Sequence, residues 1–155
     1  MSAPAVVLAD ANVFLRFLRN DHPEHSLGAR KLIEAAAEGR VVLRVQEVVV
    51  VDTFYTLTAP RMGVARPLGA RQLAALLQQP GLDVQDKTRV FEILAVCETN
   101  NVDYGDAALI FEARREKLPI VSYDRDFEKV LDVTVLTPIA WVKKNPPKGT
   151  GVSPA

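Results

Sequence analysis

The sequence predicts an α/β fold, a three-layer α/β/α sandwich around a mostly parallel central sheet. Short runs of β-branched residues alternate with stretches whose apolar positions recur at helical spacing. Parallel strands need crossover helices between them, so this alternation favours a parallel sheet. The length of 155 residues fits one domain, which we expect over residues 1–142, followed by a flexible tail over 143–155.

The first part of the chain predicts two strands and two helices. The apolar run at 6–8 predicts a strand, and it is followed by apolar residues at helical intervals over 13–18. A second helix is expected to open at 21–23 and to end at Gly39, because glycine is typical of helix C-termini. The run at 41–43 then predicts the second strand.

The middle of the chain is less clear. The segment 45–57 contains four consecutive valines, which favour β-structure by propensity alone, and we expect only its later half to be helical. Residues 67–79 predict a further helix, closed by the turn residues at 80–81. A short strand is expected at 82–84.

The last part of the chain predicts two helices and two strands. Asp86 is expected to cap a helix whose buried stripe has i, i+3, i+4, i+7 spacing. The stripe consists of Val90, Ile93, Leu94 and Cys97. Another helix begins near Tyr104 and ends before Pro119, and strands are expected at 120–122 and 133–136.

Composition narrows the function classes. Nineteen basic residues balance nineteen acidic ones, so attraction to nucleic acid has to come from local patches or from a metal ion. The single cysteine excludes an intrachain disulfide, and neither a signal peptide pattern nor a long apolar run is present. We therefore expect a cytoplasmic protein that does not contact a membrane.

Three aspartates are candidates for a shared site. Two predicted strands run directly into Asp10 and Asp124, and the carboxyl ends of parallel strands meet at one edge of a sheet. Asp106, near the start of its helix, could overlook that edge. Each aspartate alone also fits a turn or a helix cap. Three converging carboxylates would repel one another unless a cation neutralises them, and hard oxygen ligands favour Mg²⁺ or Mn²⁺ over zinc.

Three short motifs carry a family resemblance. They are Asp10-Ala-Asn12-Val13, Asp103-Tyr104-Gly105-Asp106-Ala107 and Ser122-Tyr123-Asp124-Arg125-Asp126-Phe127. In this order and spacing, over Val6 to Leu136, the chain resembles the PIN domain of VapC-type toxins. The resemblance implies a metal-dependent endoribonuclease, usually the toxin of a type II toxin–antitoxin pair. It also implies an RNA substrate, an antitoxin protein as partner and a groove that supports a homodimer.

The resemblance also implies roles for individual residues. Asp10, Asp106 and Asp124 match the invariant acids, which would hold Mg²⁺ or Mn²⁺. Asn12 and Ser122 match polar residues that support these acids, and Asp126 matches an accessory acid.

The remaining acid of the family is a glutamate in the helix after the second strand. Aligning Leu57 with the family's leucine places Asp52 at this position, as a catalytic acid one methylene shorter than glutamate. Glu47 is the competing candidate. On one helix the two would point roughly 140° apart, so they cannot both face the site.

Other readings remain open at this stage. A housekeeping PIN nuclease would use the same acids without an antitoxin. An aspartyl-phosphate phosphotransferase would use Asp10 as nucleophile, but it needs a second aspartate where this chain has Asn12. A catalytically inactive PIN module that binds RNA or protein is disfavoured because all three core aspartates are present. His22 and His25 lack a third ligand at zinc-like spacing and predict a surface role, whereas Arg16 could belong to a basic rim for phosphates.

Overall fold

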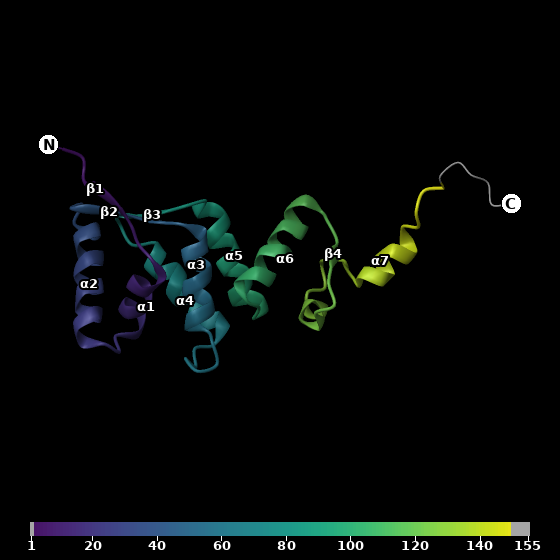
Figure 1. The fold of residues 1–155 in the computed structure, drawn as a ribbon, viewed down its shortest axis with the longest axis horizontal. Coiled ribbons are helices and arrows are strands. Elements are labelled where there is room, and N and C mark those ends of the chain that lie inside the picture. The colour runs from purple at the N-terminus through teal and green to yellow at the C-terminus, as the bar shows by residue number, and fades with distance from the viewer. Residues whose placement is uncertain (1, 150–155) are drawn as a thin grey trace. The chain divides into compact units, whose positions relative to one another are not determined.

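The computed structural model describes residues 2–149 (Figure 1). These residues form two compact units, unit 1 (residues 2–111) and unit 2 (residues 112–149), and each is described by itself. Within the described range the chain has seven α-helices and five strands, and all strand pairs are parallel. The predicted α/β class and parallel pairing are confirmed, and the arrangement is consistent with a three-layer sandwich.

Unit 1 contains a three-stranded sheet in the order β1-β2-β3. Its strands are β1 (Ala5–Leu8), β2 (Val41–Val45) and β3 (Leu82–Val84). In the register of the sheet, Leu8 lies opposite Arg44 and Leu43 lies opposite Leu82. The carboxyl ends of β1 and β2 are therefore neighbours. The two strands that the sequence placed at one sheet edge, before Asp10 and before Asp124, instead belong to different sheets: β1 lies in this sheet, and β4 (Ile120–Val121) pairs in a second one.

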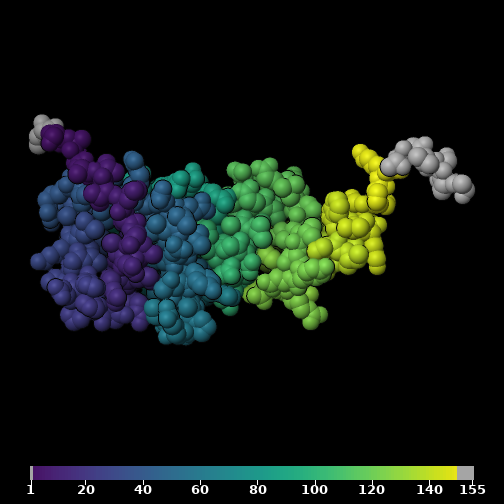
Figure 2. Space-filling model, viewed as in Figure 1, coloured from purple at the N-terminus to yellow at the C-terminus, as the bar shows by residue number. Residues whose placement is uncertain are grey.

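Strand β1 is an edge strand of this sheet. Val6 is 50% exposed and Leu8 is 71% exposed, and the N-terminal atoms drawn in purple lie on the face seen in Figure 2.

Helices connect and cover the strands of unit 1. They are α1 (Ala11–Arg19), α2 (Pro23–Ala37), α3 (Glu47–Leu57), α4 (Arg66–Leu77), α5 (Lys87–Asn100) and the first part of α6 (Tyr104–Glu116). Helix α1 packs against α2 and α3, and α4 packs against α5. Each strand of unit 1 leads into a helix, and Asp10 and Glu47 lie at two of these helix starts.

The core of unit 1 confirms most of the predicted apolar stripes. The stripe of α5 is buried at all four expected positions, including the free thiol of Cys97. The largest fully buried side chains of unit 1 also come from the other helices and β2, and they include Phe14, Leu43, Phe54, Leu73 and Ile110.

The prediction for residues 45–57 is wrong in its first half. Helix α3 begins at Glu47, so the valine run is helical rather than extended. The reason is packing: Val50, Phe54 and Leu57 are all buried at the spacing of one helix face. Burial of that face outweighs the modest β-propensity of valine.

One predicted helix end is confirmed, and one predicted helix start differs in detail. Gly39 has a φ of 78°, the left-handed conformation expected after a helix. Asp86 does stand at the N-cap of α5, but its own backbone is left-handed and its side chain makes no capping hydrogen bond.

Unit 2 is built around a two-stranded parallel ladder. It contains the end of α6, β4 (Ile120–Val121), a 3₁₀ helix η1 (Arg125–Lys129), β5 (Val135–Leu136) and α7 (Pro138–Lys144). Both strands are shorter than predicted. Helix α7 was not predicted: Pro138 occupies its first turn, and the Thr137 hydroxyl accepts from the Ala140 N–H at 3.2 Å.

The expected tail is described only in part. Helix α7 ends at Lys144, inside the segment 143–155 that the sequence assigned to the tail, and residues 150–155 lie outside the described residues. In the described range, the helices are too short or too polar to cross a bilayer.

Candidate functional site

Asp10 stands where the sequence predicted it, between a strand end and a helix start. It follows β1 by two residues and is the N-cap of α1, where its Oδ1 accepts from the Val13 N–H at 3.3 Å. The side chain is exposed. The capping role is thus real, but it uses one carboxylate oxygen and leaves Oδ2 for a ligand.

Glu47 is the first residue of α3 and follows β2 by two residues. Its carboxylate accepts from the Tyr104 hydroxyl at 3.1 Å and from the Arg89 guanidinium at 3.3 Å. Its backbone N–H donates to the Gln85 side chain at 3.1 Å. The Glu47 carboxylate is therefore fixed by two side-chain donors. One of them, Tyr104, lies on α6, the helix that also carries Asp106.

Tyr104 is one of the two residues whose side chains donate to the Glu47 carboxylate. Burial raises the pKa of the Tyr104 phenol far above its ordinary value, and the negative charge of Glu47 raises that pKa further. The hydroxyl consequently stays protonated and remains a donor to the carboxylate.

Asp52 is placed differently from Glu47. It lies five positions further along α3, and its side chain is exposed to solvent. The described residues give it no hydrogen bond or ion pair. The alignment on Leu57 favoured Asp52, whereas the contacts to α6 belong to Glu47.

Asp106 lies in the first turn of α6, as expected, and is partly buried. Its backbone N–H donates to Asp103 Oδ1 at 2.9 Å, so Asp103 acts as the cap at this helix start. This bond fixes the backbone from which the Asp106 carboxylate projects.

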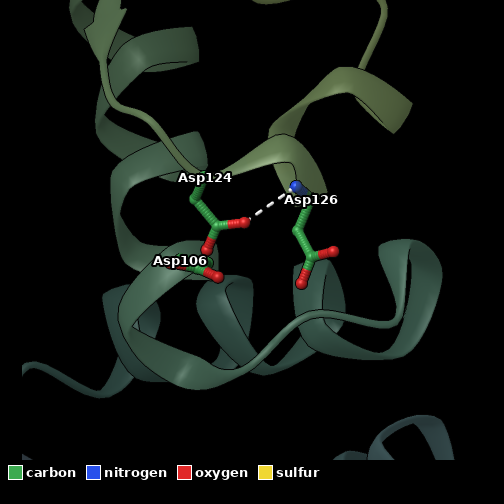
Figure 3. Close-up of side chains that lie close together, drawn as sticks. All are labelled: Asp106, Asp124 and Asp126. Carbon is green, nitrogen blue, oxygen red and sulfur yellow. Dashed lines mark hydrogen bonds between the residues drawn. The ribbon is translucent and has the colours of Figure 1, made fainter. Parts of the chain in front are cut away.

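Unit 2 contributes Ser122, Asp124 and Asp126, which follow β4. The Asp124 N–H donates to the Ser122 hydroxyl at 2.9 Å, and Asp124 Oδ1 accepts from the Asp126 N–H at 2.8 Å (Figure 3). Asp124 thereby begins η1. Both carboxylates are exposed, and the Ser122 hydroxyl bonds to the backbone N–H of Asp124, not to its carboxylate.

Asp106 of unit 1 and Asp124 and Asp126 of unit 2 each carry a carboxylate oxygen that a metal ion could bind (Figure 3). A donor set of carboxylate oxygens without histidine or cysteine suits Mg²⁺ or Mn²⁺ better than zinc. Asp106 belongs to unit 1 and the other two acids to unit 2, so their joint use as ligands is a proposal, taken up below.

Arg89 and Tyr104 were not identified from the sequence. Their relevance arises from contacts with Glu47 across 42 and 57 positions of the chain. Glu47 itself was a candidate from the sequence, and it follows a strand end in the same way as Asp10 does.

Comparison with known proteins gives one family. The description of the matching family is PIN domain, and the match covers residues 7–132. No curated protein matches the chain.

Proposed function

The chain belongs to the PIN domain family, and from this premise we propose that it is a metal-dependent endoribonuclease that hydrolyses RNA phosphodiesters. PIN domains are generally metal-dependent nucleases, so the family supplies the class of reaction. The observation that carries the proposal is that the matched range, 7–132, contains Asp10, Asp106, Asp124 and Asp126. RNA as substrate rests on the resemblance to VapC-type toxins.

The proposed ion is Mg²⁺ or Mn²⁺, held by Asp106, Asp124 and Asp126, with Asp10 as a further ligand. The donor set fits such an ion, since each of the first three residues offers a carboxylate oxygen. The carboxylate of Asp124 is exposed and accepts from a neutral backbone amide, so its negative charge remains available to a cation. Asp10 is included because it follows β1 by two residues and its Oδ2 makes no capping hydrogen bond.

The chain's own residues orient the reaction. When bound, the ion lowers the pKa of water and stabilises negative charge on the phosphate. Ser122 and the start of η1 hold Asp124, and Asp103 holds the start of α6 beneath Asp106. These hydrogen bonds keep the acids in place before substrate arrives, which lowers the cost of organising the site.

Two acids on α3, Glu47 and Asp52, compete for the position of the family's remaining acid. Asp52 is the residue that alignment on Leu57 selects, but Glu47 has better support because Tyr104, two residues before Asp106, donates to its carboxylate. In this position Glu47 would accept a proton from the attacking water. Variants of the two acids separate these assignments, as described in the Discussion.

The toxin role is a further part of the proposal. We propose an antitoxin protein as partner, a homodimer as assembly and the cytoplasm as location, in keeping with the free, buried Cys97. Helix α3 offers exposed apolar side chains to a partner at Val48 and Tyr55. Phe14 of the neighbouring helix α1 is buried in the core and is not part of this surface.

Measuring RNA cleavage with and without a metal ion tests the proposed nuclease activity. Purified protein should cut single-stranded RNA with Mg²⁺ or Mn²⁺ and stop with EDTA. Asp10→Asn and Asp106→Asn should abolish cleavage, and asparagine remains a good N-cap, so α1 should persist in the first variant. Asp83→Asn is the matched control, because Asp83 is an exposed aspartate paired with Arg44 on the sheet.

Two results would contradict the mechanism. RNA cleavage that continues in EDTA would exclude a metal ion from the mechanism. Near-normal turnover by Asp106→Asn would exclude Asp106 from the site. Co-expression with the adjacent gene tests the toxin role: a partner that never co-purifies, together with growth that never slows, would favour a housekeeping nuclease.

A further inference from the structure

A groove of about 530 Å³ lies between α1 and α2 in unit 1. Asp10 stands in its wall, so the groove begins at one of the proposed metal ligands. The other residues that matter for its chemistry are Asn12, Val13, Arg16, Glu24, His25 and Gly28. Its volume falls within the range of about 300–1,000 Å³ that is typical of small-molecule sites.

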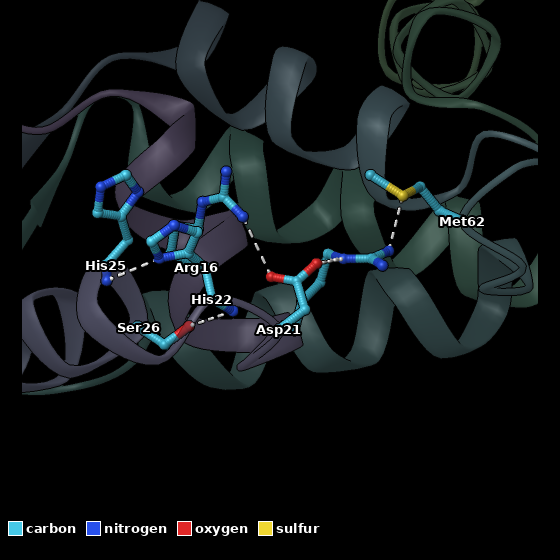
Figure 4. A network of polar contacts seen from close by, with 7 residues as sticks. Arg16, Asp21, His22, His25, Ser26 and Met62 are labelled. Atoms are coloured by element: carbon cyan, nitrogen blue, oxygen red, sulfur yellow. Dashed lines mark hydrogen bonds and ion pairs between the residues drawn. The ribbon is translucent and has the colours of Figure 1, made fainter.

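Arg16 brings a positive charge into the groove, and neighbouring residues hold it there. Arg16 Nη1 pairs with Asp21 Oδ1 at 3.2 Å, and Arg19 Nε pairs with the other oxygen of Asp21 at 2.8 Å (Figure 4). The hydrogen bond from Arg19 lowers the pKa of Asp21, which keeps this carboxylate charged. A guanidinium has five N–H groups, so the pair with Asp21 leaves donors of Arg16 for a phosphate.

His25 brings a flat ring into the groove. Its ring stacks on His22 with centroids 3.9 Å apart and planes 19° apart (Figure 4). His22 is itself fixed, because its Nδ1 accepts from the His25 N–H at 3.2 Å at the start of α2. A nucleic-acid base that stacked on His25 would extend an existing stack.

Glu24 is the second acid that lines the groove, and its carboxylate has the chemistry to distinguish between bases. A carboxylate would repel phosphate, but it accepts two hydrogen bonds side by side. Guanine presents two donors, N1–H and the N2 amino group, on its Watson–Crick edge, and adenine presents one donor group there. Glu24 therefore complements guanine.

We propose that the groove between α1 and α2 binds one unpaired guanine nucleotide of an RNA strand. The base stacks on His25 and donates to Glu24, while a phosphate contacts Arg16. This proposal rests on the proposed nuclease function, since it places the nucleotide beside Asp10. A nucleotide suits this set of residues better than an apolar peptide does, because the groove combines a cation, a flat ring and a free carboxylate.

Gly28 offers a way to block the groove without disturbing the fold. A Cβ at this position would meet no atom within 4 Å, so Gly28→Leu places its side chain in open space. Replacing a helical glycine also removes a helix penalty of about 1 kcal/mol, so the variant should be no less stable to heat. Ala37→Leu is the matched control, because Ala37 is exposed at the end of the same helix and lies outside the groove.

The test is fluorescence anisotropy with labelled UUGUU and UUAUU in EDTA, where no metal-dependent cleavage occurs. The native protein should bind UUGUU about tenfold more tightly, the scale of one bidentate base contact. Gly28→Leu should weaken binding of UUGUU at least about tenfold, Ala37→Leu should leave it unchanged, and Glu24→Gln should remove the preference for guanine.

Two outcomes would overturn the proposal. Equal affinity of the native protein for both oligonucleotides would refute the guanine assignment. If a folded Gly28→Leu variant bound UUGUU as the native protein does, RNA would not occupy the groove, and a polypeptide would become its expected occupant. The assay measures binding and needs no catalysis, so a protein that does not cleave RNA can still show the preference for guanine. A negative result for the groove is therefore distinguishable from a negative result for the nuclease activity.

Discussion

Replacing Tyr104 by phenylalanine removes one oxygen from the inside of unit 1. Tyr104 is 3% exposed, and its hydroxyl donates at 3.1 Å to the carboxylate of Glu47. Hydrogen bonds to charged groups contribute about 1.5–3 kcal/mol to stability. The Glu47 side chain is 24% exposed and keeps its bond from Arg89, so we expect the low end of that range, about 1.5 kcal/mol at pH 7.

The effect of Tyr104→Phe should depend on pH with a defined sign. The pKa of Tyr104 is raised in the folded protein, so its contribution is fully present below the unfolded pKa of about 10 and is lost as pH rises above that value. The native protein should then lose about 1.4 kcal/mol per pH unit relative to the variant. The stability difference should therefore close near pH 11.

Urea unfolding followed by far-ultraviolet circular dichroism at pH 7, 9, 10 and 11 measures this difference. Tyr55→Phe is the control, because Tyr55 is 71% exposed and its replacement should change stability by less than about 0.5 kcal/mol at each pH. A stability loss in Tyr104→Phe that stayed constant up to pH 11 would refute the burial argument. No loss at pH 7 would refute the hydrogen bond to Glu47.

Three further predictions concern the site and the core. Glu47→Gln should reduce RNA cleavage about ten- to a hundredfold in a Mn²⁺ titration, as loss of a supporting group at a metal site does, while Asp52→Asn should leave it near the native rate; the reverse order would support the alignment on Leu57. Burial raises the pKa of the Cys97 thiol to about 12, so iodoacetamide at pH 8 should modify the folded protein far more slowly than the urea-unfolded chain, and equal rates would place the thiol at the surface. Gly81→Ala should lower the thermal midpoint, because Gly81 has a φ of +85° and a Cβ there would collide with the backbone carbonyl of Ala36; an unchanged midpoint would show that this turn relaxes freely.

The sequence alone determined the features that depend on neighbouring residues. The strands at 41–43 and 82–84 and the helix stripe that ends at Cys97 follow from local periodicity. Asp10 was placed at the end of β1 for the same reason, because the end of an apolar run and the start of a helical pattern are both visible locally.

Tertiary packing decided what propensity left ambiguous. The valine run of α3 is helical because burying Val50, Phe54 and Leu57 together is worth more than the preference of single valines for strands. Helix α7 depends on the Thr137 cap and on Pro138, whose signals were masked by the polar composition of the segment that follows.

Contacts between distant positions could be known only from the folded chain. Glu47 and Asp52 are both acids of the same helix, and spacing alone showed that only one could face the site. The Tyr104 hydroxyl and the Arg89 guanidinium reach Glu47 and not Asp52. Because such pairs are joined by the packing of α3 against residues 42 and 57 positions away, no local pattern encodes which acid is held.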